Sequence, residues 1–233
     1  MQELDSRIDQ LRHQLNSLPE TAEIAALSAT GRELVDQARD AQIAVDDLTL
    51  EQKRADADVE QVKARRERDR SRMDQGLISN PKDLERMQHE LVSLERRIST
   101  LEDDELEVMA RLEDAQRDLD SYAAQVAAAD ERVAALTAAR DEKAGDIAVS
   151  LEKVTAERGA AAEGMPADLM ALYEKLRTAQ GVGAAPLRAR QCGGCHMTLN
   201  PSDLAVIAKA PVDEVVRCEE CSRILVRTTE SGL

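Results

Sequence analysis

The first two thirds of the chain carry apolar residues at alternating spacings of three and four positions. The clearest of these stripes begins at Leu84 and continues, more weakly towards its end, to Val154. It covers about ten heptads, the repeat that holds one helix against another in a coiled coil. The pattern predicts one helix from Pro81 to about Arg158, roughly 115 Å long at a rise of about 1.5 Å per residue.

A second stripe with the same alternation precedes it, from Ile24 to Met73. A shorter stripe begins at Leu4 and loses phase at Pro19. Because proline removes a helical N–H donor and clashes with the preceding turn, a kink or break is expected there. The short stripe is already in phase at Leu4, which leaves open a native start upstream of Met1.

The sequence between the two long stripes, "MDQGLISNPKDL", has the residues of a turn between helices. Gly76 suits a helix C-terminus, Asn80 an N-cap and Pro81 the first helical position. The chain is therefore predicted to reverse at about residues 74–83 and to form an antiparallel coiled-coil hairpin over residues 1–158.

Pairing the two arms about this turn places Gly31 opposite the alanine-rich run at 123–135, where small residues let the backbones approach closely. The alternative, a parallel dimer of long helices, gives no reason for this matching. Since exposed heptad faces could still pair two chains, both a monomer and a homodimer remain open.

Beyond the stripes the pattern changes twice. Residues 159–185 are predicted to hold a short amphipathic helix, "PADLMALYEKLRTAQ", and a flexible joint, "GVGAAP". Residues 186–233 contain short segments rich in β-branched residues, including "EVVRC" and "RILVRT". These segments are bounded by cysteine pairs and predict a small β domain.

Four cysteines carry the candidate chemistry: Cys192, Cys195, Cys218 and Cys221. Two CxxC turns from separate hairpins can direct four thiolates at one ion, which favours a single zinc over iron or a redox dithiol. Haem attachment would use Cys192, Cys195 and His196 but leave the second pair idle. Since four thiolates leave no coordination position for water, the zinc is predicted to be structural.

The composition excludes several functional classes. The chain has no Trp, no Phe and two Tyr, so a large aromatic core or ligand pocket is not expected. It has no nucleotide-binding loop, no complete metalloprotease helix and no βαβ context for redox chemistry, and we expect no enzymatic activity. Without a secretory signal or a long apolar run, a cytoplasmic protein without membrane contact is predicted.

The formal charge of −15 opposes general adhesion to nucleic acids, but arginines gather at two places. One group lies near the hairpin turn and the other in the β domain. The candidates for contact with a partner or with phosphate are Arg65, Arg66, Arg68, Arg188, Arg190, Arg217, Arg223 and Arg227. They keep DNA or RNA binding open as an alternative function.

Three stretches together resemble the bacterial four-cysteine zinc-ribbon coiled-coil proteins. They are "SNPKDLERMQHELVSLERR" at the turn, "PADLMALYEKLR" in the short helix, and "CGGCHMTLN" with "VVRCEECSRILVR" in the ribbon. The resemblance implies zinc at the four cysteines and a role as a binding or adaptor protein. Some members of that family are flagellar regulators that bind the nitrogen-type alternative sigma factor and, in one lineage, a flagellin messenger RNA.

The expected protein is thus mainly α, with a long antiparallel coiled-coil hairpin followed by a small C-terminal β zinc ribbon. Its expected function is that of a non-enzymatic zinc-binding adaptor or scaffold, with a protein of the transcription machinery as the candidate partner. The alternative is a nucleic-acid-binding protein that uses the arginines of the ribbon and of the hairpin turn.

Overall fold

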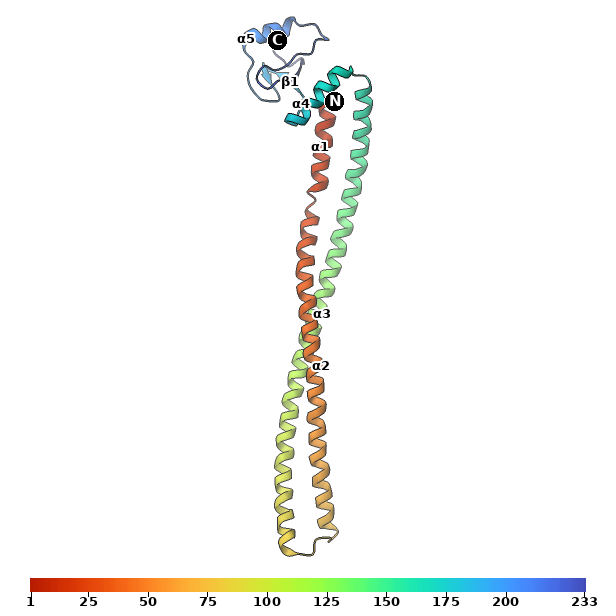
Figure 1. The fold of residues 1–233 in the computed structure, drawn as a ribbon, viewed down its shortest axis with the longest axis vertical. Helices are drawn as coiled ribbons and strands as arrows, with labels where there is room; N and C mark the ends of the chain where they lie inside the picture. The colour runs from red at the N-terminus through yellow and green to blue at the C-terminus, as the bar shows by residue number, and fades with distance from the viewer. The chain divides into compact units, whose positions relative to one another are not determined.

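The computed structural model describes residues 1–233 and is predominantly helical (Figure 1). Its elements are α1 (Gln2–Asn16), α2 (Pro19–Asp74), α3 (Pro81–Glu163), α4 (Ala167–Gln180), β1 (Ala184–Arg188), β2 (Gln191–Cys192), α5 (Pro201–Lys209) and β3 (Ile224–Val226). The chain divides into two compact units, residues 22–137 and residues 1–21 with 138–233. Helices α2 and α3 contribute to both units. None of the helices combines the length and hydrophobicity that crossing a membrane requires.

In the unit of residues 22–137, α2 and α3 run antiparallel with their apolar stripes facing each other. The buried residues of this seam are Val45, Leu48, Val59, Leu94, Ile98, Leu101, Val108 and Leu136. Ion pairs cross the seam between Lys63 and Glu102 at 2.8 Å and between Arg111 and Glu51 at 3.2 Å. The later residue on α2 pairs with the earlier residue on α3, as antiparallel helices require. The predicted coiled-coil hairpin within one chain is therefore confirmed.

The turn between these helices forms where the sequence predicts it. Helix α2 ends at Asp74 and α3 begins at Pro81. Gly76 takes a left-handed φ of 67°, which glycine adopts without steric cost, and its amide donates to the Met73 carbonyl at 2.9 Å. The side chain of Asn80 accepts a hydrogen bond from the Lys82 amide at 3.1 Å and so caps α3.

The break predicted at Pro19 is also present. Helix α1 ends at Asn16. Pro19 has no N–H to continue the helical hydrogen bonds, so carbonyls of the last turn need other donors. The Ser17 hydroxyl supplies one of these donors, to the His13 carbonyl at 2.7 Å. The predicted end of α3 near Arg158 is wrong, because the helix continues through Gly159 to Glu163. A single helical glycine costs only about 1 kcal/mol, and the helix stops where Pro166 restricts the residue before it.

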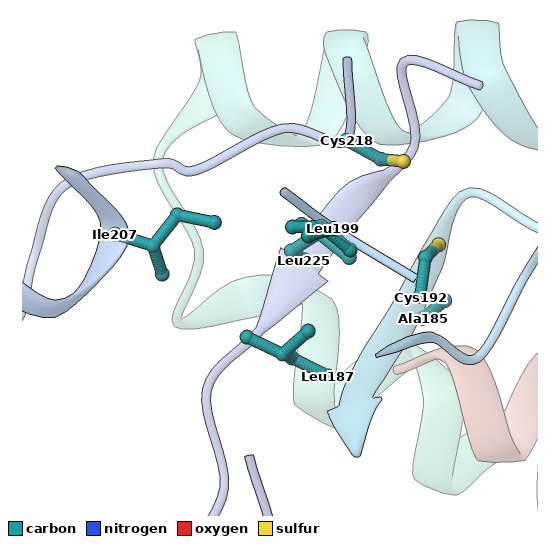
Figure 2. Close-up of a cluster of buried hydrophobic side chains, with 7 residues drawn as sticks. All are labelled: Ala185, Leu187, Cys192, Leu199, Ile207, Cys218 and Leu225. Atoms are coloured by element: carbon teal, nitrogen blue, oxygen red, sulfur yellow. The ribbon is translucent and has the colours of Figure 1, made fainter. Parts of the chain in front are cut away.

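The C-terminal ribbon is a three-stranded sheet with β1 in the centre. Strand β1 pairs antiparallel with β2 and parallel with β3. Asn200 caps α5 by accepting from the Asp203 amide at 2.9 Å. Figure 2 shows the core that these elements enclose. Its members are Ala185, Leu187, Cys192, Leu199, Ile207, Cys218 and Leu225.

The segment 181–186, predicted to be a flexible joint, is instead tied to the start of the chain. The Gln2 side-chain oxygen accepts hydrogen bonds from the amides of Gly183 at 2.8 Å and Ala184 at 3.2 Å. Gly183 is buried against Tyr173, and β1 already begins at Ala184. The sequence prediction failed here because the contact joins residues far apart in the chain.

Gly183 has no room for a side chain, which makes it a test of this packing. A Cβ at this position would lie 2.7 Å from the Tyr173 carbonyl oxygen and 2.8 Å from its ring. Gly183→Ala is therefore expected to destabilise the protein by about 1–3 kcal/mol, measured as a lower midpoint of urea unfolding.

Gly145 in α3 provides the matched control, because a Cβ there meets nothing within 4 Å. Gly145→Ala should raise the midpoint, since alanine favours a helix interior over glycine by about 1 kcal/mol. If both substitutions shifted the midpoint of urea unfolding in the same direction, Gly183 would not be packed tightly against Tyr173.

Candidate metal centre

Two turns of the ribbon present the four cysteines. In the first, the His196 amide donates to the Cys192 carbonyl at 2.8 Å, and in the second the Ser222 amide donates to the Cys218 carbonyl at 2.8 Å. The residues that follow the second cysteine of each pair, His196 and Ser222, both have a left-handed φ of 62°. Two different sequences, "CGGCH" and "CEECS", thus fold into the same local turn.

The sulfur atoms of the two turns converge. All four lie within 4.8 Å of one another, with 3.8 Å between the sulfurs of Cys192 and Cys221 and 3.9 Å between those of Cys195 and Cys218. These separations exceed the S–S bond of about 2.05 Å, so the thiols are not disulfides. Zn–S bonds of about 2.3 Å in a tetrahedron place the sulfurs about 3.8 Å apart, which the spacing fits.

The surroundings give the thiols different acidities. Burial raises the pKa of the Cys192 thiol, and it raises that of Cys218 to about 12. Burial acts in the same direction on Cys221, but hydrogen bonds from the backbone and side chain of Arg223 and from the thiols of Cys195 and Cys218 together outweigh it and lower the pKa to about 7. Since zinc binds thiolates, loading this site releases protons, and the affinity for zinc falls as the pH falls.

The arrangement accounts for every position of a tetrahedral ion. Four protein thiols leave no place for the water that a catalytic zinc carries, so the centre holds one structural zinc ion. His196 is exposed and is not among the clustered donors. The first cysteine pair begins in β2 and the second precedes β3, and these are the two edge strands of the sheet. An ion held by both pairs would therefore connect the two edges of the sheet beside the core in Figure 2.

The ribbon arginines make contacts within the chain. Arg227 donates to the carbonyls of Ile207 at 3.2 Å and Ala210 at 2.6 Å, at the C-terminus of α5. Arg223 donates to the carbonyls of Gln180 at 3.3 Å and Val182 at 3.0 Å, at the C-terminus of α4. Both guanidinium groups therefore cap helices whose last carbonyls lack partners.

The other candidate arginines are scattered. Arg217 and Arg190 donate to the carbonyls of Ser222 and Gly232, at 3.0 Å and 3.1 Å, and Arg188 pairs with Glu230. Near the hairpin turn, Arg65 pairs with Glu90 and Arg66 with Glu95, whereas the exposed Arg68 makes no ion pair. Seven of the eight thus have intramolecular partners, and nucleic-acid binding stays a prediction.

The capping role of Arg227 can be measured. Arg227→Ala removes the charged donor from the carbonyls at the end of α5 and is expected to destabilise the ribbon by about 1.5–3 kcal/mol. The result should be faster loss of zinc to a chelator, followed by absorbance of a zinc dye.

Arg188 is the matched control, because it lies in the same domain and its ion pair with Glu230 is exposed. An exposed pair contributes about 0–1 kcal/mol, so Arg188→Ala should release zinc at nearly the wild-type rate. Equal rates for the two variants would contradict a capping role for Arg227.

Comparison with known families agrees with this geometry. A family model described as a CT398-like coiled coil hairpin domain matches residues 1–181. The chain belongs to this family. A second model, a C4-type zinc ribbon domain, matches residues 191–225 and includes all four clustered cysteines. The predicted resemblance, the fold class and the single structural zinc are thereby confirmed.

Relatives match nearly the whole length of the chain. An uncharacterised protein of Mycobacterium tuberculosis is 35% identical over 226 residues, which are 96% of this chain and 91% of the relative. A solved structure from Mycobacterium smegmatis matches with a TM-score of 0.80 and 30% identity, covering 97% of this chain and 94% of the other. CT398 of Chlamydia trachomatis has the same fold, with a TM-score of 0.65, 20% identity and coverage of 97% and 94%.

Sequence reasoning missed one cluster in this CT398-like chain. The fully buried Asp5 binds Arg158, Arg177 and Tyr173, and these contacts connect α1, α3 and α4. A signal was present, because Asp5 stands three residues before Ile8 on the apolar stripe of α1, where a charge is out of place. Such a carboxylate is tolerated only where cations and donors surround it.

Proposed function

We propose that this protein is a non-enzymatic zinc-binding adaptor that binds a protein partner through its coiled coil and its ribbon. The observation that carries the proposal is the closed set of four thiols within 4.8 Å of one another. A metal centre whose ligand positions are all taken by cysteine maintains a fold and offers no site to a substrate.

The surface of the hairpin supports a role in protein binding. Several large apolar side chains lie away from the seam, with Ile43 and Leu50 on α2 and Leu106 on α3 each more than half exposed. A long pair of helices presents such side chains over an extended surface suited to protein contacts. The family resemblance suggests a protein of the transcription machinery as the partner.

The experiment is affinity capture from the native cell with the zinc-loaded chain, followed by mass spectrometry. The control is the same chain with Cys192→Ser and Cys218→Ser, which is expected to retain the helices and lose the folded ribbon. We expect at least one protein to be recovered by the wild type and lost with the control. Equal recoveries from both chains would overturn the proposal for the ribbon.

Absence of enzymatic activity is tested separately with a disulfide substrate and a thiol reductant. Since the cysteines serve as zinc ligands and the ribbon is expected to unfold without zinc, we expect neither the zinc-loaded nor the zinc-free chain to give turnover above the uncatalysed rate. Turnover that survives removal of zinc would identify the chain as a thiol oxidoreductase instead.

A further inference from the structure

The ribbon carries valine side chains that its own core leaves uncovered. Val212 is 97% exposed and Val206 is 69% exposed, and Val215 and Val226 are each more than two fifths exposed. Leu187, Leu199, Ile207 and Leu225, in contrast, lie in the buried core of the ribbon (Figure 2). Exposed aliphatic groups gathered on one small domain are typical of a contact surface.

These valines line two adjoining grooves. The larger, of about 590 Å³, lies between the 212–216 segment and β3, and Leu169 of α4 contributes to its wall. The smaller, of about 240 Å³, is lined by α5 residues that include Val206. Residues 214–216 line both grooves. We call the lining of these two neighbouring grooves the valine furrow.

The charged groups of the valine furrow are unbalanced. Four carboxylates line it and none makes an ion pair within the chain: those of Asp203, Asp213, Glu214 and Glu219. Two arginines, Arg217 and Arg227, also line it, but their guanidinium groups donate to backbone carbonyls. The furrow therefore combines apolar side chains with four carboxylates against two guanidinium groups, and its lining keeps an excess of negative charge.

We propose that the valine furrow binds a short protein segment in which aliphatic side chains are flanked by lysine or arginine. The aliphatic groups would cover the valines, and the cations would pair with the carboxylates of the lining, which favours such a segment over an acidic one. The same carboxylates repel the phosphates of nucleic acids and anionic lipids. This inference rests on the proposed adaptor function and specifies the chemistry of the partner.

The probe for this proposal is a displayed library of random dodecapeptides selected on the full zinc-loaded chain. The enriched peptides are expected to combine Leu, Ile or Val with Lys or Arg. A fluorescent copy of an enriched peptide should lose affinity by about tenfold or more, or about 1.4 kcal/mol, when Val212→Asp is introduced. Its binding should also weaken with added salt and with the double substitution Asp213→Lys and Glu214→Lys.

The control is Val149→Asp, at a valine of α3 that is 69% exposed and far in sequence from the ribbon. It should leave the peptide affinity unchanged. Because Val212 is almost entirely exposed, Val212→Asp should keep its zinc, and zinc content measured for each variant verifies that the ribbon is folded.

Each other outcome overturns the proposal. The furrow does not bind a basic segment if the selection enriches no peptides or enriches acidic ones. The same conclusion follows if the furrow substitutions leave the peptide affinity unchanged. Self-association in sedimentation velocity that Val212→Asp abolishes would identify a second copy as the occupant instead.

Failure of the furrow is distinguishable from failure of the adaptor function. If cellular capture recovers a partner that requires the zinc ligands but tolerates Val212→Asp, the adaptor function stands and the furrow proposal falls. If capture recovers no partner while basic peptides bind at Val212, the furrow stands and the adaptor proposal falls.

Discussion

Replacing Cys218 by serine is expected to release the zinc and to unfold the chain beyond about residue 186, while the coiled-coil helices remain. Serine is a poor ligand for zinc, and a buried thiol cluster without its fourth member cannot close the tetrahedron. The core residues of the ribbon are few and include two of the ligands themselves, Cys192 and Cys218. We therefore expect so small a core not to fold without its metal.

The helices should survive because their stability has other sources. The seam between α2 and α3 contains buried aliphatic residues, most of them at 45–59 on α2 and 94–108 on α3, and its ion pairs involve no ribbon residue. We therefore expect a zinc content near zero for Cys218→Ser and loss of amide protection in the ribbon. Circular dichroism should show helix content almost unchanged.

Met197→Ala serves as the control for this experiment. Met197 lies two residues after Cys195 but is 52% exposed, so its truncation should leave zinc content and protection at wild-type levels. A collapse of the helical signal together with the ribbon in Cys218→Ser would contradict the independence of the two folds.

The parts of the structure that the sequence predicted are those governed by local rules. Heptad spacing determines which face of α3 is buried, and Gly76, Asn80 and Pro81 each act within a few residues of the turn they form. The zinc centre was equally predictable, because each CxxC turn is a local structure and one ion requires both.

The parts that it did not predict depend on residues distant in the chain. Nothing local indicates that the Gln2 side chain binds the amide of Gly183, or that Arg223 and Arg227 cap the ends of α4 and α5. Arginines near a metal site suggest an external ligand only until the carbonyls around them are known. The extended segment "EVVRC" forms no named strand, only a bridge between Arg217 and Ile224, because the zinc turn follows at once.

Asp5→Ala is expected to have the second large effect, on the packing of α1 against α3 and α4. The carboxylate is fully buried, accepts hydrogen bonds from Arg158 at 2.9 Å and from the Tyr173 hydroxyl at 2.6 Å, and forms an ion pair with Arg177 at 3.1 Å. The hydrogen bond from Arg158 to Asp5 raises the pKa of that guanidinium. Burial, and then the hydrogen bond to Asp5, raises the pKa of Tyr173.

Removing the carboxylate leaves two cations and a hydroxyl together without their common acceptor. Loss of one member of a buried charge pair costs about 3–5 kcal/mol. We expect the lower end of this range, because Arg158 keeps its pair with Glu174 and Arg177 keeps its pair with Asp9. Hydrogen exchange should show faster opening of α1, of α4 and of the amides of Gly183 and Ala184, which Gln2 in the same helix holds.

Asp9→Ala is the matched control. Asp9 lies in α1, like Asp5, and pairs with Arg177 at 2.9 Å, but its side chain is half exposed. Solvent already screens that pair, so its loss should cost about 0–1 kcal/mol and leave exchange at Gly183 nearly unchanged. If Asp5→Ala and Asp9→Ala accelerated exchange equally, burial would not distinguish the two carboxylates, and the start of the chain would not be what holds α4 and β1 in place. A large effect confined to Asp5→Ala would instead mean that the buried charge cluster, and not the exposed pair of Asp9 with Arg177, holds α1 against α3 and α4.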